Sequence, residues 1–207
     1  MNPLRSPIRL ALTAGACALL VGCVSLFPKG PPAQLYRFGA PDVPANTALA
    51  PSAVVIAHGP ADFDTAASTD RILTVNGQDA AYIEASRWVS PAPVLFEEAL
   101  ERAFQRTPGA PRLVSRGALI AAPLLLNLNV QSFEARYDHG ADAPPTVTVV
   151  LRATVVRLDG RTVAGETLLT AAHAASENRV GSIVQAYDAA VQDVLAQLIT
   201  WTSGLKT

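Results

Sequence analysis

The sequence predicts a single α+β domain in which a mostly antiparallel or mixed β-sheet is covered on one face by two amphipathic helices. Half of the 207 residues are hydrophobic and only 16% are charged, which is typical of a chain that folds around a core. Several β-prone runs are separated by turn signals, and only two segments show long helical periodicity. Because two helices are too few to cover both faces of such a sheet, we expect both on the same face.

The first part of the domain carries short strand signals. We expect strands at 35–39 (LYRFG), 53–57 (AVVIA), 71–75 and 80–84. Asn76-Gly77 lies between the last two runs and predicts a hairpin, because these residues accept the positive φ angles of a tight turn. Segments 40–52 and 58–70 are rich in turn-forming residues, so we expect them to be loops.

A helix is expected to begin at Pro91. Ser90 can cap it, and a proline fits the first helical position, where no backbone N–H is needed. The apolar stripe consists of Leu95, Phe96, Ala99, Leu100, Ala103 and Phe104. The polar face consists of Glu97, Glu98, Glu101, Arg102 and Gln105. Within it, Glu98 and Arg102 have the spacing of an ion pair, and the Pro-Gly pair at 108–109 ends the helix.

Longer strands and a second helix are expected to follow. Hydrophobic alternation from Leu124 shifts parity before Phe133, which predicts a β-bulge near Gln131. A strand over 147–155 then leads through Asp159-Gly160 into a return strand from Arg161 to about His173. The last segment keeps helical spacing of its apolar residues for about six turns. Those residues are Val180, Ile183, Val184, Tyr187, Val191, Val194, Leu195 and Leu198.

The N-terminus has the organisation of a secretory signal. Arg5 and Arg9 form a positive region, and the apolar run that follows is shorter than the roughly 20 residues of a membrane span. The sequence LVGC, which ends at Cys23, resembles the lipobox of bacterial lipoproteins. We therefore expect a signal peptide over 1–22, an acylated cysteine with a proline-rich tether over 23–34, and the folded domain over 35–207. An ordinary signal peptide or an uncleaved anchor with a chance cysteine is the alternative.

Acylation of Cys23 is expected to fix the protein to a membrane. Diacylglycerol on the sulfur and an N-acyl chain such as palmitate on the amine together hold the protein firmly in the bilayer, because each buried methylene contributes about 0.8 kcal/mol. No other cofactor is expected. Val24 follows the cysteine in place of the aspartate that retains enteric lipoproteins in the inner membrane. The sequence thus predicts the periplasmic face of the outer membrane, with the inner membrane as the alternative.

Charge and motifs argue against nucleic acid binding and against catalysis. Cleavage before Cys23 leaves 14 basic and 17 acidic residues, a net charge of −3, whereas nucleic acid binding needs basic patches. The chain has no nucleophile elbow, P-loop or dinucleotide-binding glycine pattern. His58, His139 and His173 have no neighbours at metal-ligand spacing. We therefore expect neither a catalytic site nor a metal centre.

Weaker alternatives remain for some polar and aromatic residues. His58, Asp62 and Asp64 offer a conceivable metal group in one loop, against an ordinary polar loop. The adjacent Glu97 and Glu98 cannot converge as a catalytic pair, so we expect a solvated helix face. Trp88 is expected to anchor the core rather than to stack on a ligand, and Arg87 to pair at the surface.

Several segments together resemble the ABC-type transport auxiliary lipoproteins, the PqiC-like family. They are the lipobox, LYRFG, DRILTVNGQDAAYIEASRWVSPAPVLFEEALERAF, and LLLNLNVQSFEARY with TVVLRATVVRLDGR, in this order. The most specific piece is Arg87-Trp88 followed by Pro91 and an amphipathic helix. The resemblance implies a lipidated Cys23 and motif positions Arg87 and Trp88 of structural role.

The resemblance also implies a function. Proteins of this family are non-enzymatic partners of an MCE-domain protein and its ABC permease and ATPase, which move phospholipids between membranes. The sequence leaves two other functions open. One is an outer-membrane assembly or stability lipoprotein that braces an envelope complex, and the other is a stand-alone periplasmic lipid-binding protein.

Overall fold

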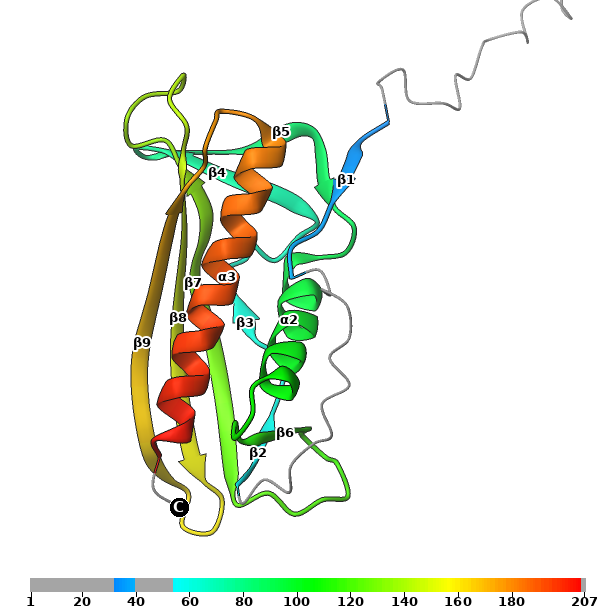
Figure 1. The fold of residues 1–207 in the computed structure, drawn as a ribbon, viewed down its shortest axis with the longest axis vertical. Helices are drawn as coiled ribbons and strands as arrows, with labels where there is room; N and C mark the ends of the chain where they lie inside the picture. Colours follow the sequence, from blue (N-terminus) through cyan, green and yellow to red (C-terminus); the bar gives the residue numbers. More distant parts are fainter. Residues whose placement is uncertain (1–31, 40–53, 206–207) are drawn as a thin grey trace, which may run out of the picture. The chain divides into compact units, whose positions relative to one another are not determined.

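The computed structural model describes residues 32–39 and 54–205. This part of the chain contains nine strands and two helices. The strands are β1 (Gln34–Tyr36), β2 (Val55–His58), β3 (Asp62–Phe63), β4 (Arg71–Asn76), β5 (Asp79–Trp88), β6 (Arg112–Ser115), β7 (Leu124–Arg136), β8 (Thr146–Arg157) and β9 (Thr162–Ala174). The helices are α2 (Ala92–Arg106) and α3 (Val180–Ser203). Both helices lie on one face of a single mixed sheet, which confirms the predicted fold class (Figure 1).

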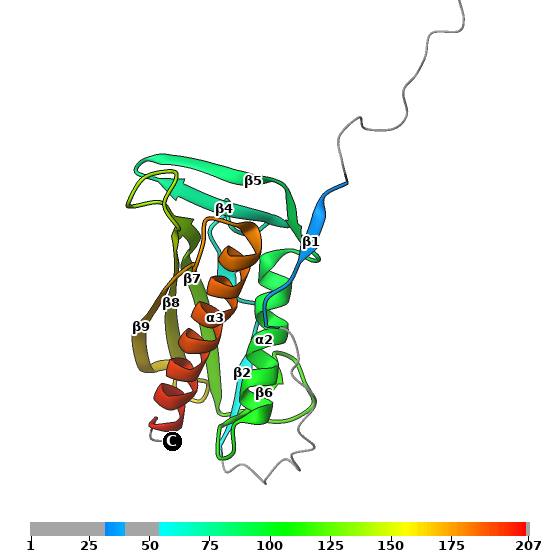
Figure 2. The same cartoon turned by 45° about the horizontal axis from the view of Figure 1, so that its top comes forward.

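Strand β7 is the centre of the sheet. One edge of β7 pairs antiparallel with β8 along nearly its whole length, and β8 continues antiparallel into β9. The other edge pairs in parallel with three short strands in succession, β2, β3 and β4. β6 extends the sheet beside β2, and β5 and then β1 extend it beside β4. Figure 2 shows the β4–β5 hairpin running across one end of the long strands.

Two local predictions are confirmed in the sheet. The β7–β8 register shifts between Val130 and Ser132, so Gln131 forms the expected β-bulge. The β4–β5 hairpin closes at the Asn76–Asp79 pair, and its turn places Gly77 at a φ of +60°. A glycine adopts this angle without the steric penalty that a Cβ atom brings.

The start of α2 differs from the prediction. Pro91 itself occupies the N-cap with φ −51° and ψ 141°, the helix begins at Ala92, and no side chain caps it. The expected cap by Ser90 is therefore wrong, because the extended backbone of Pro91 moves the helix start one residue beyond the reach of that serine. The first-turn proline is Pro93, which loses no hydrogen bond there.

Two strands were not expected from the sequence. β3 lies inside segment 58–70, which was predicted to be a loop, and β6 follows α2. They have two and four residues, too few for an alternating pattern to stand out. β5 also continues to Trp88, beyond the expected end at 84. The predicted loop at 40–52 lies outside the described residues.

The core lies between the sheet and the two helices. Alternate residues of β8 are fully buried beneath α3, as the sequence pattern predicts: Val147, Val149, Leu151, Ala153 and Val155. At the level of β5 the core is aromatic, with Phe38, Trp88, Phe133 and Tyr187 in mutual edge or tilted contact. Within residues 32–39 and 54–205, no helix combines the length and apolar character needed to cross a membrane.

Candidate functional site

Trp88 is part of the core. Its side chain is 2% exposed and packs edge-on against Phe38 and Tyr187, with ring centroids 5.0 and 5.2 Å away. Its backbone N–H donates a 2.7 Å hydrogen bond to the carbonyl of Asp70. The ring therefore has no face available for stacking on a ligand.

Arg87 points away from the core into solvent. Its Nη1 donates to both carboxylate oxygens of Asp70 at 3.0 Å, and both side chains are about half exposed. The side chain of Arg87 and the backbone of Trp88 thus bind the same residue, Asp70, which directly precedes β4. The Arg-Trp pair fastens the end of β5 to the start of β4.

The segment after β1 is held by both helices. The backbone N–H of Gly39 donates a 2.6 Å hydrogen bond to Asp188 on α3, and Arg102 on α2 donates to the Gly39 carbonyl. Arg102 also pairs with Glu98 at 3.5 Å, as the helical spacing predicts, and Arg37 reaches the same carboxylate at 3.1 Å. These contacts fix the point at which the chain enters the domain.

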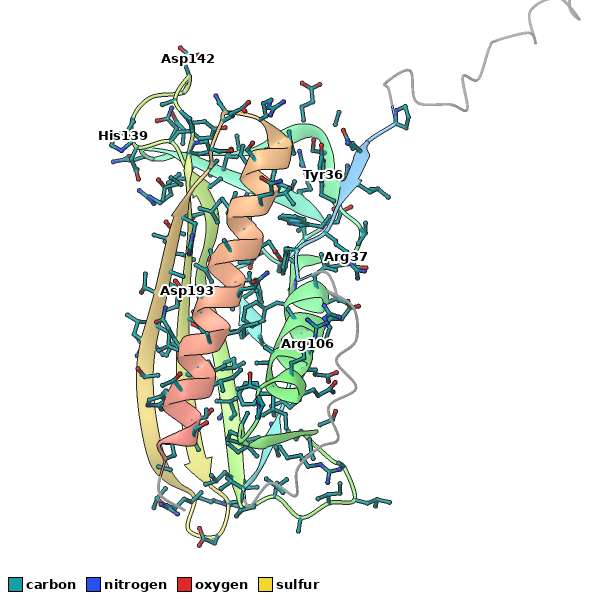
Figure 3. All side chains as sticks on the ribbon, viewed as in Figure 1. Tyr36, Arg37, Arg106, His139, Asp142 and Asp193 are labelled. Carbon is teal, nitrogen blue, oxygen red and sulfur yellow. The ribbon has the colours of Figure 1, made fainter. Side chains whose placement is uncertain are left out.

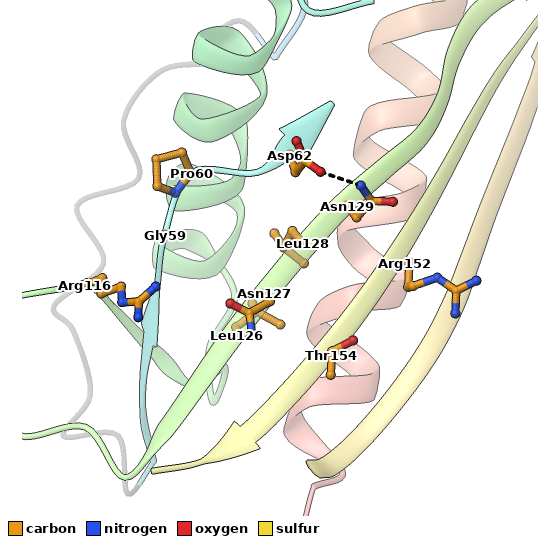
Figure 4. A pocket seen from close by; sticks show the side chains of 10 residues that line it. All are labelled: Gly59, Pro60, Asp62, Arg116, Leu126, Asn127, Leu128, Asn129, Arg152 and Thr154. Carbon is orange, nitrogen blue, oxygen red and sulfur yellow. Dashed lines mark hydrogen bonds between the residues drawn. The ribbon is translucent and has the colours of Figure 1, made fainter. Parts of the chain in front are cut away.

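A groove of about 550 Å³ lies where the parallel ladder on β7 is interrupted (Figure 4). β2 pairs with β7 as far as Leu126 and β3 resumes at Asn129, so Asn127 and Leu128 have no strand partner on that edge. Asn129 donates to Asp62 at 2.9 Å across the groove. The break thus produces a hollow with polar walls.

Two arginines stand on either side of this groove (Figure 4). Arg152 is paired with Glu166 on β9. The guanidinium of Arg116 has no ion-pair partner among residues 32–39 and 54–205. The groove therefore contains the guanidinium of Arg116, unpaired within this part of the chain, and the carboxylate of Asp62, in a hollow that is open to solvent.

The three histidines do not converge. His139 lies in the connection between β7 and β8, as does Asp142, and both are away from Asp193 on α3 (Figure 3). His173 on β9 approaches Asp193 at 3.4 Å, and both are exposed. His58 on β2 is 3% exposed and faces α2.

His58 meets two glutamates of α2. Its Nδ1 lies 2.8 Å from Oε1 of Glu97, and its ligand atom lies within 4.8 Å of those of Glu97 and Glu101. The contact with Glu97 raises the pKa of His58, although burial acts in the opposite direction. Glu97 and Glu98 diverge as expected. The expectation that Glu97 lies on a solvated face is wrong, because its side chain is only 25% exposed. The side chain is drawn inward because its carboxylate contacts the buried histidine.

The loop-borne metal group considered from the sequence does not form. Asp62 accepts from Asn129, and Asp64 accepts from the backbone of Ala66, so neither joins His58. The residues that do join His58 lie about 40 positions further along the chain. An isolated histidine and a Glu-x-x-x-Glu helix spacing were the available signals, but sequence spacing cannot bring β2 and α2 together. Cys23 lies outside the described residues.

Comparison with known proteins gives a family and a fold. The family model of the ABC-type transport auxiliary lipoprotein component matches residues 36–199, which run from the end of β1 into α3. No curated protein sequence matches the chain.

Solved structures share the fold at low sequence identity. Protein XCC0632 from Xanthomonas campestris superposes with a TM-score of 0.70 at 20% identity, covering 82% of this chain and 94% of that one. The hypothetical protein CT253 from Chlamydia trachomatis superposes with a TM-score of 0.52 at 11% identity, covering 73% of this chain and 96% of that one. The likeness thus extends over most of the described domain.

Proposed function

The chain belongs to the ABC-type transport auxiliary lipoprotein component family, and from this premise we propose that it serves an MCE-type ABC system that moves phospholipids between membranes. Membership of the family makes it an auxiliary lipoprotein component of ABC-type transport, which implies a non-catalytic role. The observation that carries the proposal is the family match over residues 36–199, nearly the whole folded domain. The MCE-domain protein, its permease and its ATPase are the proposed partners.

Anchoring is the first part of the proposed mechanism. The lipobox supports acylation of Cys23, and Val24 supports the periplasmic face of the outer membrane. Residues 23–34 contain three prolines and form the proposed tether up to Gln34, where β1 begins. At about 3 Å per residue, such a tether would keep the domain near the bilayer.

Docking is the second part. The aromatic core and the hydrogen bonds at Gly39 and Asp70 support a rigid domain, and a docking scaffold requires rigidity. Energy for transport would come from the ATPase partner. The auxiliary domain contributes by holding the MCE protein near the membrane to which Cys23 is attached.

Affinity purification of the tagged full-length protein from detergent-solubilised membranes tests this function. We expect the MCE-domain protein to be recovered together with the permease and ATPase. Recovery of a β-barrel assembly in their place would support the bracing alternative. Recovery of phospholipid without any of these proteins would support a stand-alone lipid-binding protein. Either result would contradict the proposal.

A further inference from the structure

Three metal-ligand side chains meet where α2 faces β2. Glu97 and Glu101 are four residues apart, so they share one side of the helix. His58 on β2 faces that side, and the three ligand atoms all lie within 4.8 Å of one another. None of the three residues lines the groove on β7 or takes part in the Arg87–Asp70 contact, and nothing in the proposed transport function requires them.

The polar atoms of this cluster are not satisfied by the protein alone. His58 is 3% exposed, yet its Nδ1 has no hydrogen bond of acceptable geometry despite lying 2.8 Å from Glu97 Oε1. Glu97 Oε2 is also buried without a hydrogen-bond partner. Unpaired buried polar atoms cost about 1–3 kcal/mol each, so native proteins seldom keep them without a reason.

The charge of the cluster is also unbalanced. Glu98, the intervening carboxylate, is turned away toward Arg37 and Arg102. Among the ion pairs within residues 32–39 and 54–205, Glu97 is joined only to His58, and none includes Glu101. A histidine must be neutral to bind a metal ion, and with His58 neutral the two carboxylates carry two negative charges, which a divalent cation neutralises.

We propose that His58, Glu97 and Glu101 bind a divalent transition-metal ion of the Zn²⁺ class. One imidazole nitrogen and two carboxylate oxygens suit zinc better than magnesium or calcium, which prefer oxygen ligands alone. Donor atoms at about 2.1 Å from one zinc ion lie roughly 3.0–3.4 Å apart. The observed 2.8 Å between Nδ1 and Oε1 is close to this separation. The ion would crosslink β2 to α2 and keep a fourth position for water or for a group from a partner.

Zinc titration of the full-length chain in detergent tests the site. Cys17 and Cys23 are first replaced by serine, so that no unprocessed precursor contributes a free thiol that binds zinc itself. After treatment with EDTA, the protein is titrated with Zn²⁺ against a chromophoric chelator. We expect one equivalent to bind with a Kd of about 1 μM or below. Failure to bind zinc at this affinity overturns the proposal.

Two glutamine variants of the same helix separate the site from general charge effects. Glu101→Gln removes an exposed ligand and should weaken zinc binding at least about tenfold. Glu98→Gln removes the same charge one turn away and should leave the affinity unchanged. Equal affinities of the two variants would overturn the proposal, whatever their absolute value.

A spectroscopic measurement identifies the ligands independently. Co²⁺ in the zinc site should give visible bands without a thiolate charge-transfer band, and His58→Gln should abolish them. Circular dichroism of that variant verifies that the domain is folded. Unchanged bands in folded His58→Gln would show that the ion binds elsewhere and would contradict the assignment.

Discussion

The hydroxyl group of Tyr187 on α3 donates a 2.9 Å hydrogen bond to the backbone carbonyl of Leu73 on β4, 114 residues earlier in the chain. Tyr187 is completely buried, and burial raises its pKa well above the usual value of 10.0. The hydroxyl therefore stays protonated and remains a donor at physiological pH. This contact ties the last helix to β4 of the β4–β5 hairpin, a strand that lies more than a hundred residues earlier in the chain.

Removal of this hydroxyl should destabilise the domain. Tyr187→Phe leaves the packing of the ring intact but leaves the Leu73 carbonyl without this donor, so we expect a loss of about 1–2 kcal/mol in the free energy of unfolding. Tyr137→Phe is the matched control, because its hydroxyl bonds Asn178 at 2.9 Å in an exposed position. Urea denaturation measures both variants. Equal losses would show that burial of the Tyr187 bond adds nothing.

Two glycines with the same backbone angle should respond differently to substitution. Gly39 and Gly77 have φ values of +62° and +60°. A Cβ atom at Gly39 would lie 2.7 Å from the Cβ of Ala99, whereas one at Gly77 meets no atom within 4 Å. Both alanine variants share the backbone strain, so we expect Gly39→Ala to cost about 1–3 kcal/mol more, through overpacking. Thermal unfolding followed by circular dichroism tests the difference, and similar midpoints would refute it.

Arg87 and Trp88 are adjacent in sequence but should contribute very unequal amounts to stability. Trp88→Ala removes a buried ring from the aromatic core, which should cost about 3–5 kcal/mol. Arg87→Ala breaks a solvent-exposed ion pair with Asp70 and should cost less than about 1 kcal/mol. The comparison uses chemical denaturation of each variant. A large loss for Arg87→Ala would mean that its contact with Asp70 determines how the hairpin packs.

Lipidation should depend on one of the two cysteines. Cys23→Ala is expected to accumulate as an unprocessed, unacylated precursor, because the sulfur that accepts diacylglycerol is gone. Cys17→Ala is the control, since Cys17 lies inside the apolar run and the lipobox remains intact. Intact-mass spectrometry distinguishes the products. Processing of Cys23→Ala with normal membrane retention would contradict the lipoprotein assignment.

The elements with strong local signals could be predicted from the sequence. The parity change before Phe133 located the bulge at Gln131, and Asn76-Gly77 located the hairpin. β3 and β6 could not be predicted, because two- and four-residue parallel strands form by pairing with distant partners. The same applies to His58, whose neighbours Glu97 and Glu101 lie about 40 residues further along the chain and meet it only in the folded domain.

The entry of the chain into the domain has a mechanical consequence. Any tension applied at the N-terminal side reaches β1 first, and only three residue pairs join this strand to β5. The next residues are held more strongly, because Phe38 is completely buried and Gly39 makes two hydrogen bonds, one through its N–H and one through its carbonyl. Under load β1 would separate from β5 first, which lengthens the tether by a few residues while the rest of the domain stays folded. We then expect the extraction of the buried Phe38 side chain to limit the rate of forced unfolding.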